Sequence, residues 1–124
     1  MVAYIALGGL LGTLARYGLQ GWIQDRFARG SFPLGTLVVN VIGSLALGFL
    51  MRYTTGSLVV TPAVRAGLTI GFCGAFTTMS AFAYEGQALF ADGSYLQGWL
   101  YLGGTVLACL LATIAGIVLA DQLL

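Results

Sequence analysis

The sequence has no histidine, no lysine and few charged residues of any kind. Five arginines and four acidic residues give a formal net charge of +1. Charged residues make up 7% of the chain, whereas they make up about 25% of an ordinary soluble domain. A charge this small and scattered does not indicate a nucleic-acid surface. We therefore expect no nucleic-acid partner.

The missing histidines also limit the chemistry of the chain. Cys73 and Cys109 both fall in apolar segments, without paired spacing and without a histidine to complete a zinc site. No potential nucleophile has a visible base partner. We expect two small buried thiols and no enzyme activity.

Hydrophobic residues, by contrast, make up 59% of the chain. One membrane span needs roughly 20 apolar residues, so this length holds at most about five spans. The breaks in hydropathy indicate four, at about 2–22, 34–51, 62–90 and 98–120. We expect one all-α transmembrane domain covering 1–124, with a loop from Tyr53 to Thr61 and a turn at Asp92 to Ser94. Because Met1 to Ala15 carries no charged side chain, the first segment is expected to be a retained span and not a signal peptide.

The third apolar segment is longer than one span requires. It contains the run Gly71-Phe-Cys-Gly-Ala-Phe-Thr-Thr-Met-Ser80. These glycines and hydroxyls suit a break in the helix near 74–78, which lipid tolerates only where the exposed backbone is buried in protein or faces a wet cavity. A continuous helix with packing glycines is the alternative, and composition leaves both open.

Arginines do not favour either orientation in the membrane. Arg52 and Arg65 lie on one side of four spans, while Arg26 and Arg29 lie on the other. Because the distribution of basic residues sets orientation, this balance predicts insertion in both directions and an antiparallel pair. Arg16 lies inside the first span and could change the balance.

Small residues recur at four-residue spacing in every span. Such rows let helices approach closely, which predicts a tight bundle that oligomerises. The rows are Gly8 with Gly12, Ser44 with Gly48, Gly67 with Gly71, and Gly104, Ala108, Ala112 and Gly116.

Three polar side chains lie where lipid disfavours them. An arginine at the bilayer centre costs about 2.5–3.5 kcal/mol on insertion scales, so Arg16 either extends to the interface, faces an anion or holds helices together. Asn40 could donate to an anion or bridge two helices, and we favour the first role. Glu85 could be interfacial, an ion-entry group or a proton carrier, and we favour the interfacial position.

Hydroxyl and thiol groups recur every four residues in the fourth span, at Tyr101, Thr105, Cys109 and Thr113. This spacing places them on one stripe of a helix. The stripe reads as a polar track, unless the hydroxyls bond back to their own helix. Neutral donors, one arginine and aromatic rings with positive edges favour an anion over a metal or a proton.

Three motifs then become recognisable in order along nearly the whole chain. They are Gly8-Gly-Leu-Leu-Gly-Thr-Leu-Ala-Arg16-Tyr17, Gly35-Thr-Leu-Val-Val-Asn40-Val-Ile-Gly43 and Gly71-Phe-Cys-Gly-Ala-Phe-Thr77-Thr78-Met79-Ser80-Ala81-Phe82. Together they closely resemble the Fluc, or CrcB, fluoride channel family. The resemblance implies an antiparallel dual-topology homodimer in the inner membrane, with two fluoride pores that let fluoride leave the cytoplasm, and a structural sodium ion at the dimer centre.

The resemblance also implies roles for individual residues. The carbonyls of Gly74 and Thr77 would hold the sodium ion, and Glu85 would lie at a pore mouth. Met79 stands where the family usually has phenylalanine, and Cys109 stands where a hydroxyl is common. The implied pore residues are Asn40, Met79, Ser80, Phe82, Tyr101, Thr105 and Cys109.

Two other classes of protein fit some of these features. A small multidrug transporter also has four short spans, but such proteins resemble one another in carrying a first-span glutamate, and the first span here has no acid. A structural subunit would explain the glycines but not the hydroxyl stripe.

Overall fold

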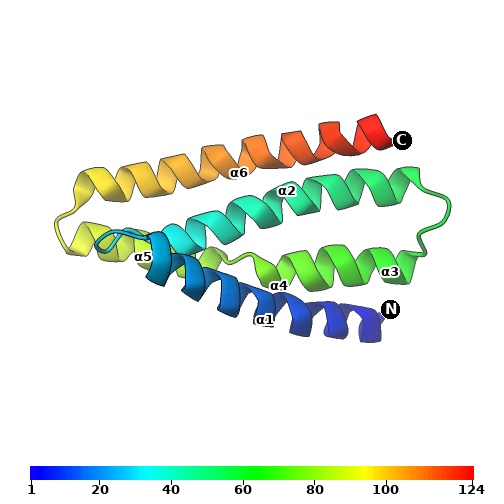
Figure 1. Ribbon diagram of the computed structural model, residues 1–124, viewed down its shortest axis with the longest axis horizontal. Coiled ribbons are helices and arrows are strands. Elements are labelled where there is room, and N and C mark those ends of the chain that lie inside the picture. Colours follow the sequence, from blue (N-terminus) through cyan, green and yellow to red (C-terminus); the bar gives the residue numbers. More distant parts are fainter.

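The computed structural model describes all residues, 1–124, and every regular element in it is a helix (Figure 1). The elements are α1 (Val2–Phe27), α2 (Leu34–Gly56), α3 (Pro62–Ala66), the π-helical η1 (Gly67–Cys73), α4 (Gly74–Phe76), α5 (Met79–Ala91) and α6 (Tyr95–Leu123). Elements α3 to α5 form one segment, Pro62–Ala91, so four segments are long and apolar enough to cross a membrane. The prediction of an all-α protein with four spans is confirmed.

The four segments run alternately back and forth. Both termini lie at one end of the bundle, beside the connection between α2 and α3 (Figure 1). The turns at the opposite end contain Gly30 and Gly93, whose φ angles are 62° and 79°. A side chain rarely adopts such a backbone conformation, so glycine suits both turns.

The helix α2 extends further than hydropathy indicates. It runs to Gly56, so the predicted loop from Tyr53 was wrong in its first four residues, and the connection is Ser57 to Thr61. The hydroxyls of Thr54 and Thr55 donate to the carbonyls of Leu50 and Met51, each at 2.7 Å. Hydropathy reports contact with lipid, whereas a helix ends where its backbone hydrogen bonds end.

Glycines let α1 approach η1 closely. A Cβ atom on Gly8 would overlap the carbonyl oxygen of Gly67, and one on Gly12 would overlap that of Phe72. Such contacts are possible only between bare backbones. The predicted packing role of these glycines is confirmed.

The helices α2 and α6 form the most extensive contact in the bundle. A Cβ atom on Gly48 would overlap the carbonyl oxygen of Thr113, and one on Gly116 would overlap that of Leu45. Gly104, by contrast, has no neighbouring atom within 4 Å, so the packing role expected for it is not fulfilled within this chain. The helices α1 and α6 do not contact each other, and they lie on opposite sides of the bundle with α2 and the third span between them.

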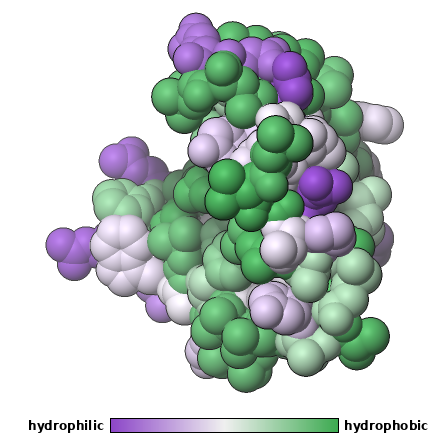
Figure 2. Space-filling model, turned by 90° about the vertical axis from the view of Figure 1, so that its right-hand side faces the viewer, coloured by the Kyte–Doolittle hydropathy of each residue, from purple (hydrophilic) through white to green (hydrophobic).

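Most of the surface is apolar. Only 25 of the 124 residues are buried, and large hydrophobic side chains are exposed along α1 and α6. The end that carries both termini is mostly hydrophobic, with small hydrophilic patches (Figure 2). A surface of this kind suits lipid or another apolar helix.

Candidate functional site

The third span is interrupted at two residues. Element α4 ends at Phe76, and Thr77 and Thr78 have extended backbones, with ψ angles of 160° and 114°. Threonine suits this conformation because its branched Cβ favours extended backbone. Thr78 also caps α5, since its Oγ1 accepts from the amide of Ala81 at 3.2 Å. The break thus occupies the last part of the predicted range 74–78.

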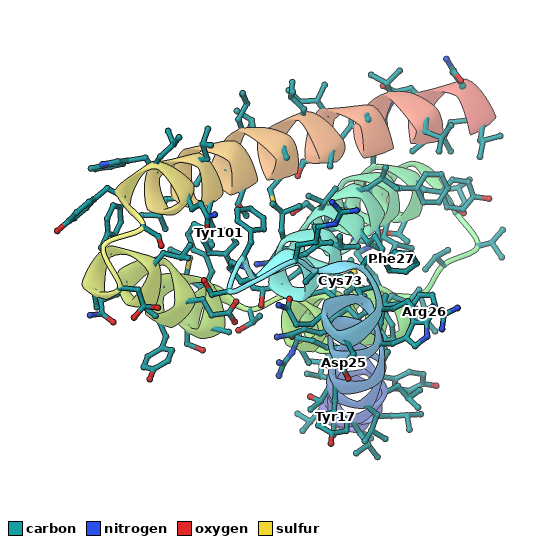
Figure 3. All side chains as sticks on the ribbon, turned by 60° about the vertical axis from the view of Figure 1, so that its left-hand side comes forward. Tyr17, Asp25, Arg26, Phe27, Cys73 and Tyr101 are labelled. Carbon is teal, nitrogen blue, oxygen red and sulfur yellow. The ribbon has the colours of Figure 1, made fainter.

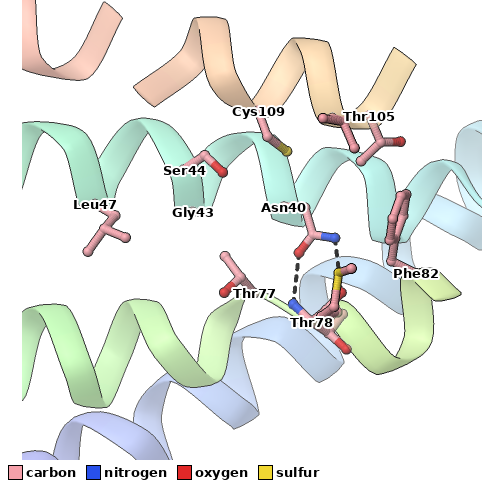
Figure 4. Close-up of a pocket in the computed structure, with 11 residues that line it drawn as sticks. Asn40, Gly43, Ser44, Leu47, Thr77, Thr78, Phe82, Thr105 and Cys109 are labelled. Carbon is pink, nitrogen blue, oxygen red and sulfur yellow. Dashed lines mark hydrogen bonds between the residues drawn. The ribbon is translucent and has the colours of Figure 1, made fainter. Parts of the chain in front are cut away.

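Side chains from two different helices hold this break. The Nδ2 of Asn40 donates to the Thr78 carbonyl at 3.1 Å, and the Thr78 amide donates to Asn40 Oδ1 at 2.8 Å (Figure 4). From α1, the Nε of Arg16 donates to the Ala75 carbonyl at 3.0 Å. Of the roles considered for Arg16, this contact supports the one that holds helices together. Asn40 likewise bridges two helices.

A cavity of about 340 Å³ lies between α2, the break and α6 (Figure 4). It brings together six of the predicted site residues: Asn40, Thr77, Met79, Phe82, Thr105 and Cys109. It does not include Tyr101, Ser80 or Gly74. Its other lining residues are Gly43, Ser44, Leu47, Thr78 and Val106.

Ser44 was not recognised as a candidate for this site. It lies four residues after Asn40 and therefore on the same face of α2. Thr36 lies four residues before Asn40, lines the second pocket described below, and was also missed. The three polar residues at this spacing are a signal that could have identified both.

Two buried hydroxyls beside the cavity have no hydrogen-bond partner, those of Tyr101 and Thr105. Tyr101 is fully buried and points inward from α6 toward α2 and α5 (Figure 3). Its ring packs against Phe82 and Phe32, at centroid distances of 5.2 and 5.6 Å. Burying an unpaired polar group costs about 1–3 kcal/mol, so each hydroxyl is a donor held available at a cost in stability.

The hydroxyl stripe of α6 is therefore divided. Thr113 donates to the carbonyl of Cys109 at 2.9 Å, as expected for a hydroxyl that bonds back to its own helix. Thr105 makes no such bond. Only the part of the stripe nearer the start of α6 retains unpaired donors.

Glu85 faces a second, polar pocket of about 260 Å³. The Oγ1 of Thr36 lies 2.8 and 2.9 Å from the two carboxylate oxygens and donates to them. In turn, the Nε2 of Gln20 donates to Thr36 Oγ1 at 3.0 Å. The pocket is lined by Gln20, Gln24, Ser31, Pro33, Thr36 and Glu85.

The remaining predicted site residues lie on the outside of the chain. Gly74 and Ser80 are exposed, and Met79 is 74% exposed although it also borders the cavity. These positions are accessible to lipid or to another protein chain.

The carbonyls of Gly74 and Thr77 have lost their usual helical donors. The Thr78 amide, which would bond to Gly74, donates to Asn40 instead. The Ala81 amide, which would bond to Thr77, donates to Thr78 Oγ1. Two such carbonyl oxygens are suitable ligands for a hard cation.

Comparison with known proteins gives consistent results. Residues 3–117 match the family described as "CrcB-like protein, Camphor Resistance (CrcB)". A protein of Geotalea uraniireducens (strain Rf4), named "Fluoride-specific ion channel FluC", is 43% identical over 122 residues, which cover 98% of each chain. Relatives with the same name occur in Sorangium cellulosum (strain So ce56), at 43% identity over 98% of this chain and 94% of the relative, and in Nitratidesulfovibrio vulgaris (strain DSM 19637 / Miyazaki F), at 47% identity over 86% and 85%. The resemblance found in the three sequence motifs is thereby confirmed, and this chain belongs to the CrcB-like protein family.

Proposed function

We propose that this protein is a fluoride-selective channel that lets fluoride leave the cytoplasm passively and so reduces its toxicity. The observation that carries this proposal is the pair of buried, unpaired hydroxyls on Tyr101 and Thr105. Fluoride is a small anion that accepts hydrogen bonds strongly. A channel for it must replace water with closely placed donors while binding weakly enough for exit.

The proposed path starts in the cavity at the break. Asn40, Thr105 and Cys109 line it there, and Phe82 lies between this cavity and the buried Tyr101. The positive edge of the Phe82 ring can contact an anion without carrying a charge. From Tyr101 the path continues to Glu85 at the pore mouth. Met79 and Ser80 complete the proposed pore from the exposed side of the break.

We further propose that two chains form an antiparallel, dual-topology homodimer in the cell's inner membrane. Three observations support this assembly: the balanced loop arginines, the apolar exposed surface and the exposed position of Met79 and Ser80. One chain alone leaves the proposed pore open to lipid on that side. Labelling of a terminal cysteine from both sides of the membrane tests the topology, and labelling from one side only would contradict it.

A structural sodium ion at the dimer centre is the third element of the proposal. The carbonyls of Gly74 and Thr77 would hold it, because their helical donors are engaged elsewhere. The ion would supply a positive charge that ties the two breaks together. Replacing sodium with a large organic cation should weaken the dimer, and a dimer indifferent to sodium would argue against these ligands.

Ion efflux from liposomes containing the purified protein tests the main proposal. Separate liposomes are loaded with fluoride, chloride and a cationic dye, and efflux is driven by a membrane potential. We expect fluoride to leave and the other two solutes to remain. Dye transport would instead favour a small multidrug transporter, an alternative to which the comparisons lend no support. If none of the three solutes left the liposomes, the result would favour a structural membrane protein without a transported substrate.

A further inference from the structure

We infer that the polar pocket beside Glu85 is a binding site for a monovalent metal cation, distinct from the sodium proposed at the break. The pocket lies between α1, α2 and α5, and its only nonpolar lining residue is Pro33. A volume of about 260 Å³ leaves room for an ion with part of its hydration shell.

The first argument is the charge of Glu85. This carboxylate is half-buried within a membrane span, and it has no cationic partner. The one ion pair in the structure joins Arg52 to Asp121 at the other end of the bundle. Arg16, on the helix that borders the pocket, donates to the Ala75 carbonyl instead. Charged groups inside membrane proteins are normally paired, so a cation from solution would supply the missing partner.

The second argument is the set of oxygen atoms that surrounds the pocket. Gln20 Oε1 is a buried acceptor without a donor. The single proton of Thr36 Oγ1 is used on Glu85, and one of its two lone pairs accepts from Gln20 Nε2, so the second lone pair remains for an ion. Carboxylate, amide and hydroxyl oxygens are the ligands that hard cations prefer.

The charge of the ion follows from the same ligands. Glu85 is the only acidic residue that lines the pocket. No group of three or more acidic, histidine or cysteine side chains in the chain could hold a metal ion together. One carboxylate balances one positive charge, which favours a monovalent ion over calcium or magnesium.

The consequence for transport rests on the proposed channel function. An unpaired carboxylate at the pore mouth would repel fluoride as it leaves, whereas a bound cation would cancel that repulsion. Glu85 and its cation would then carry no net charge together, and the polar side chains around them could still hydrogen-bond to fluoride as it leaves the pore.

Crystals of the full dimer soaked with thallium(I), a monovalent cation with a strong anomalous signal, test this inference. We expect an anomalous peak in contact with the Glu85 carboxylate in the wild type. The peak should be lost in Glu85→Gln, which has nearly the same shape, and weakened in Gln20→Met. Asp25→Asn, which removes an exposed acid from the same end of α1, is the matched control and should keep it. The crystal structures themselves report whether each variant is folded.

Two outcomes would overturn the inference: no peak in the wild-type pocket at any pH, as expected if the site takes only a proton, or a peak that persists unchanged in Glu85→Gln. Fluoride efflux from liposomes separates this failure from failure of the proposed function. Fluoride-selective efflux without a thallium peak would contradict the cation site and support the proposed channel function. A thallium peak without fluoride efflux would support the cation site and contradict the channel function.

Discussion

Asn40 holds the main chain of Thr78 through two hydrogen bonds, one donated and one accepted. Its side chain is therefore fixed in orientation, with Nδ2 toward the carbonyl and Oδ1 toward the amide (Figure 4). An amide nitrogen carries two hydrogens, so one remains for another acceptor. The structural role of Asn40 and its proposed contact with fluoride are compatible.

Asn40→Asp should impair both stability and transport. The substitution replaces the donor to the Thr78 carbonyl with a carboxylate oxygen, so a hydrogen bond is lost and two acceptors face each other, which costs about 1–3 kcal/mol in unfolding free energy. The added negative charge should also lower fluoride efflux. Thermal unfolding and liposome efflux measure the two effects. Gln87→Glu, the same change on an exposed side of α5, is the control, and equal stability of both variants would contradict the two-bond contact.

Tyr101→Phe and Thr105→Val should lower fluoride efflux without lowering stability. Each removes a buried hydroxyl that has no partner, so the folded state loses a desolvation cost and no hydrogen bond. Thr113→Val is the matched control, because it removes a hydroxyl from the same helix that bonds back to Cys109. Efflux in Thr105→Val equal to that of the wild type would remove Thr105 from the path.

Cys109 should be the thiol through which small reagents block the channel. It lines the cavity and is partly exposed, whereas Cys73 is 1% exposed. A small methanethiosulfonate reagent should therefore modify Cys109, as measured by mass spectrometry, and reduce fluoride efflux. Cys109→Ser should be insensitive, and Cys73→Ala should stay sensitive. If the reagent still reduced fluoride efflux in Cys109→Ser, the block would come from modification of another residue, which would contradict this prediction.

Gly12→Ala and Gly18→Ala should have opposite effects on stability. A methyl group on Gly12 would overlap the Phe72 carbonyl, and such overpacking typically costs about 1–3 kcal/mol. Gly18 has no neighbour within 4 Å, so alanine there should stabilise α1 by about 0.5–1 kcal/mol. Thermal unfolding in detergent compares the two variants, and a neutral Gly12→Ala would mean that α1 can move away from η1.

Hydropathy and small-residue spacing were sufficient to predict the four spans and most of the glycines at which helices approach closely, because both signals are local in the sequence. The rotation of each helix about its axis was not predictable. Thr105 and Thr113 are the same residue type on the same predicted stripe, yet only one bonds back to its helix. That difference depends on tertiary packing, which a sequence pattern does not report.

The π-helical segment η1 also has no clear signal in the sequence. Its wider turn changes the register between α3 and α4, and therefore which side chains face α1. Arg16 could not be assigned to a partner for the same reason. Its contact with the Ala75 carbonyl depends on that register and on the close approach allowed by Gly8 and Gly12.

Asn40 bonds to the main chain within the break and Arg16 bonds to it just before the break, which has a consequence for ion selectivity. A break tethered to one helix could shift when that helix tilts, but this one is tethered to both α1 and α2. It would move only if both helices moved together. In the proposed channel, the groups that the break presents to an ion would then keep their spacing, and a halide larger than fluoride could not push them apart.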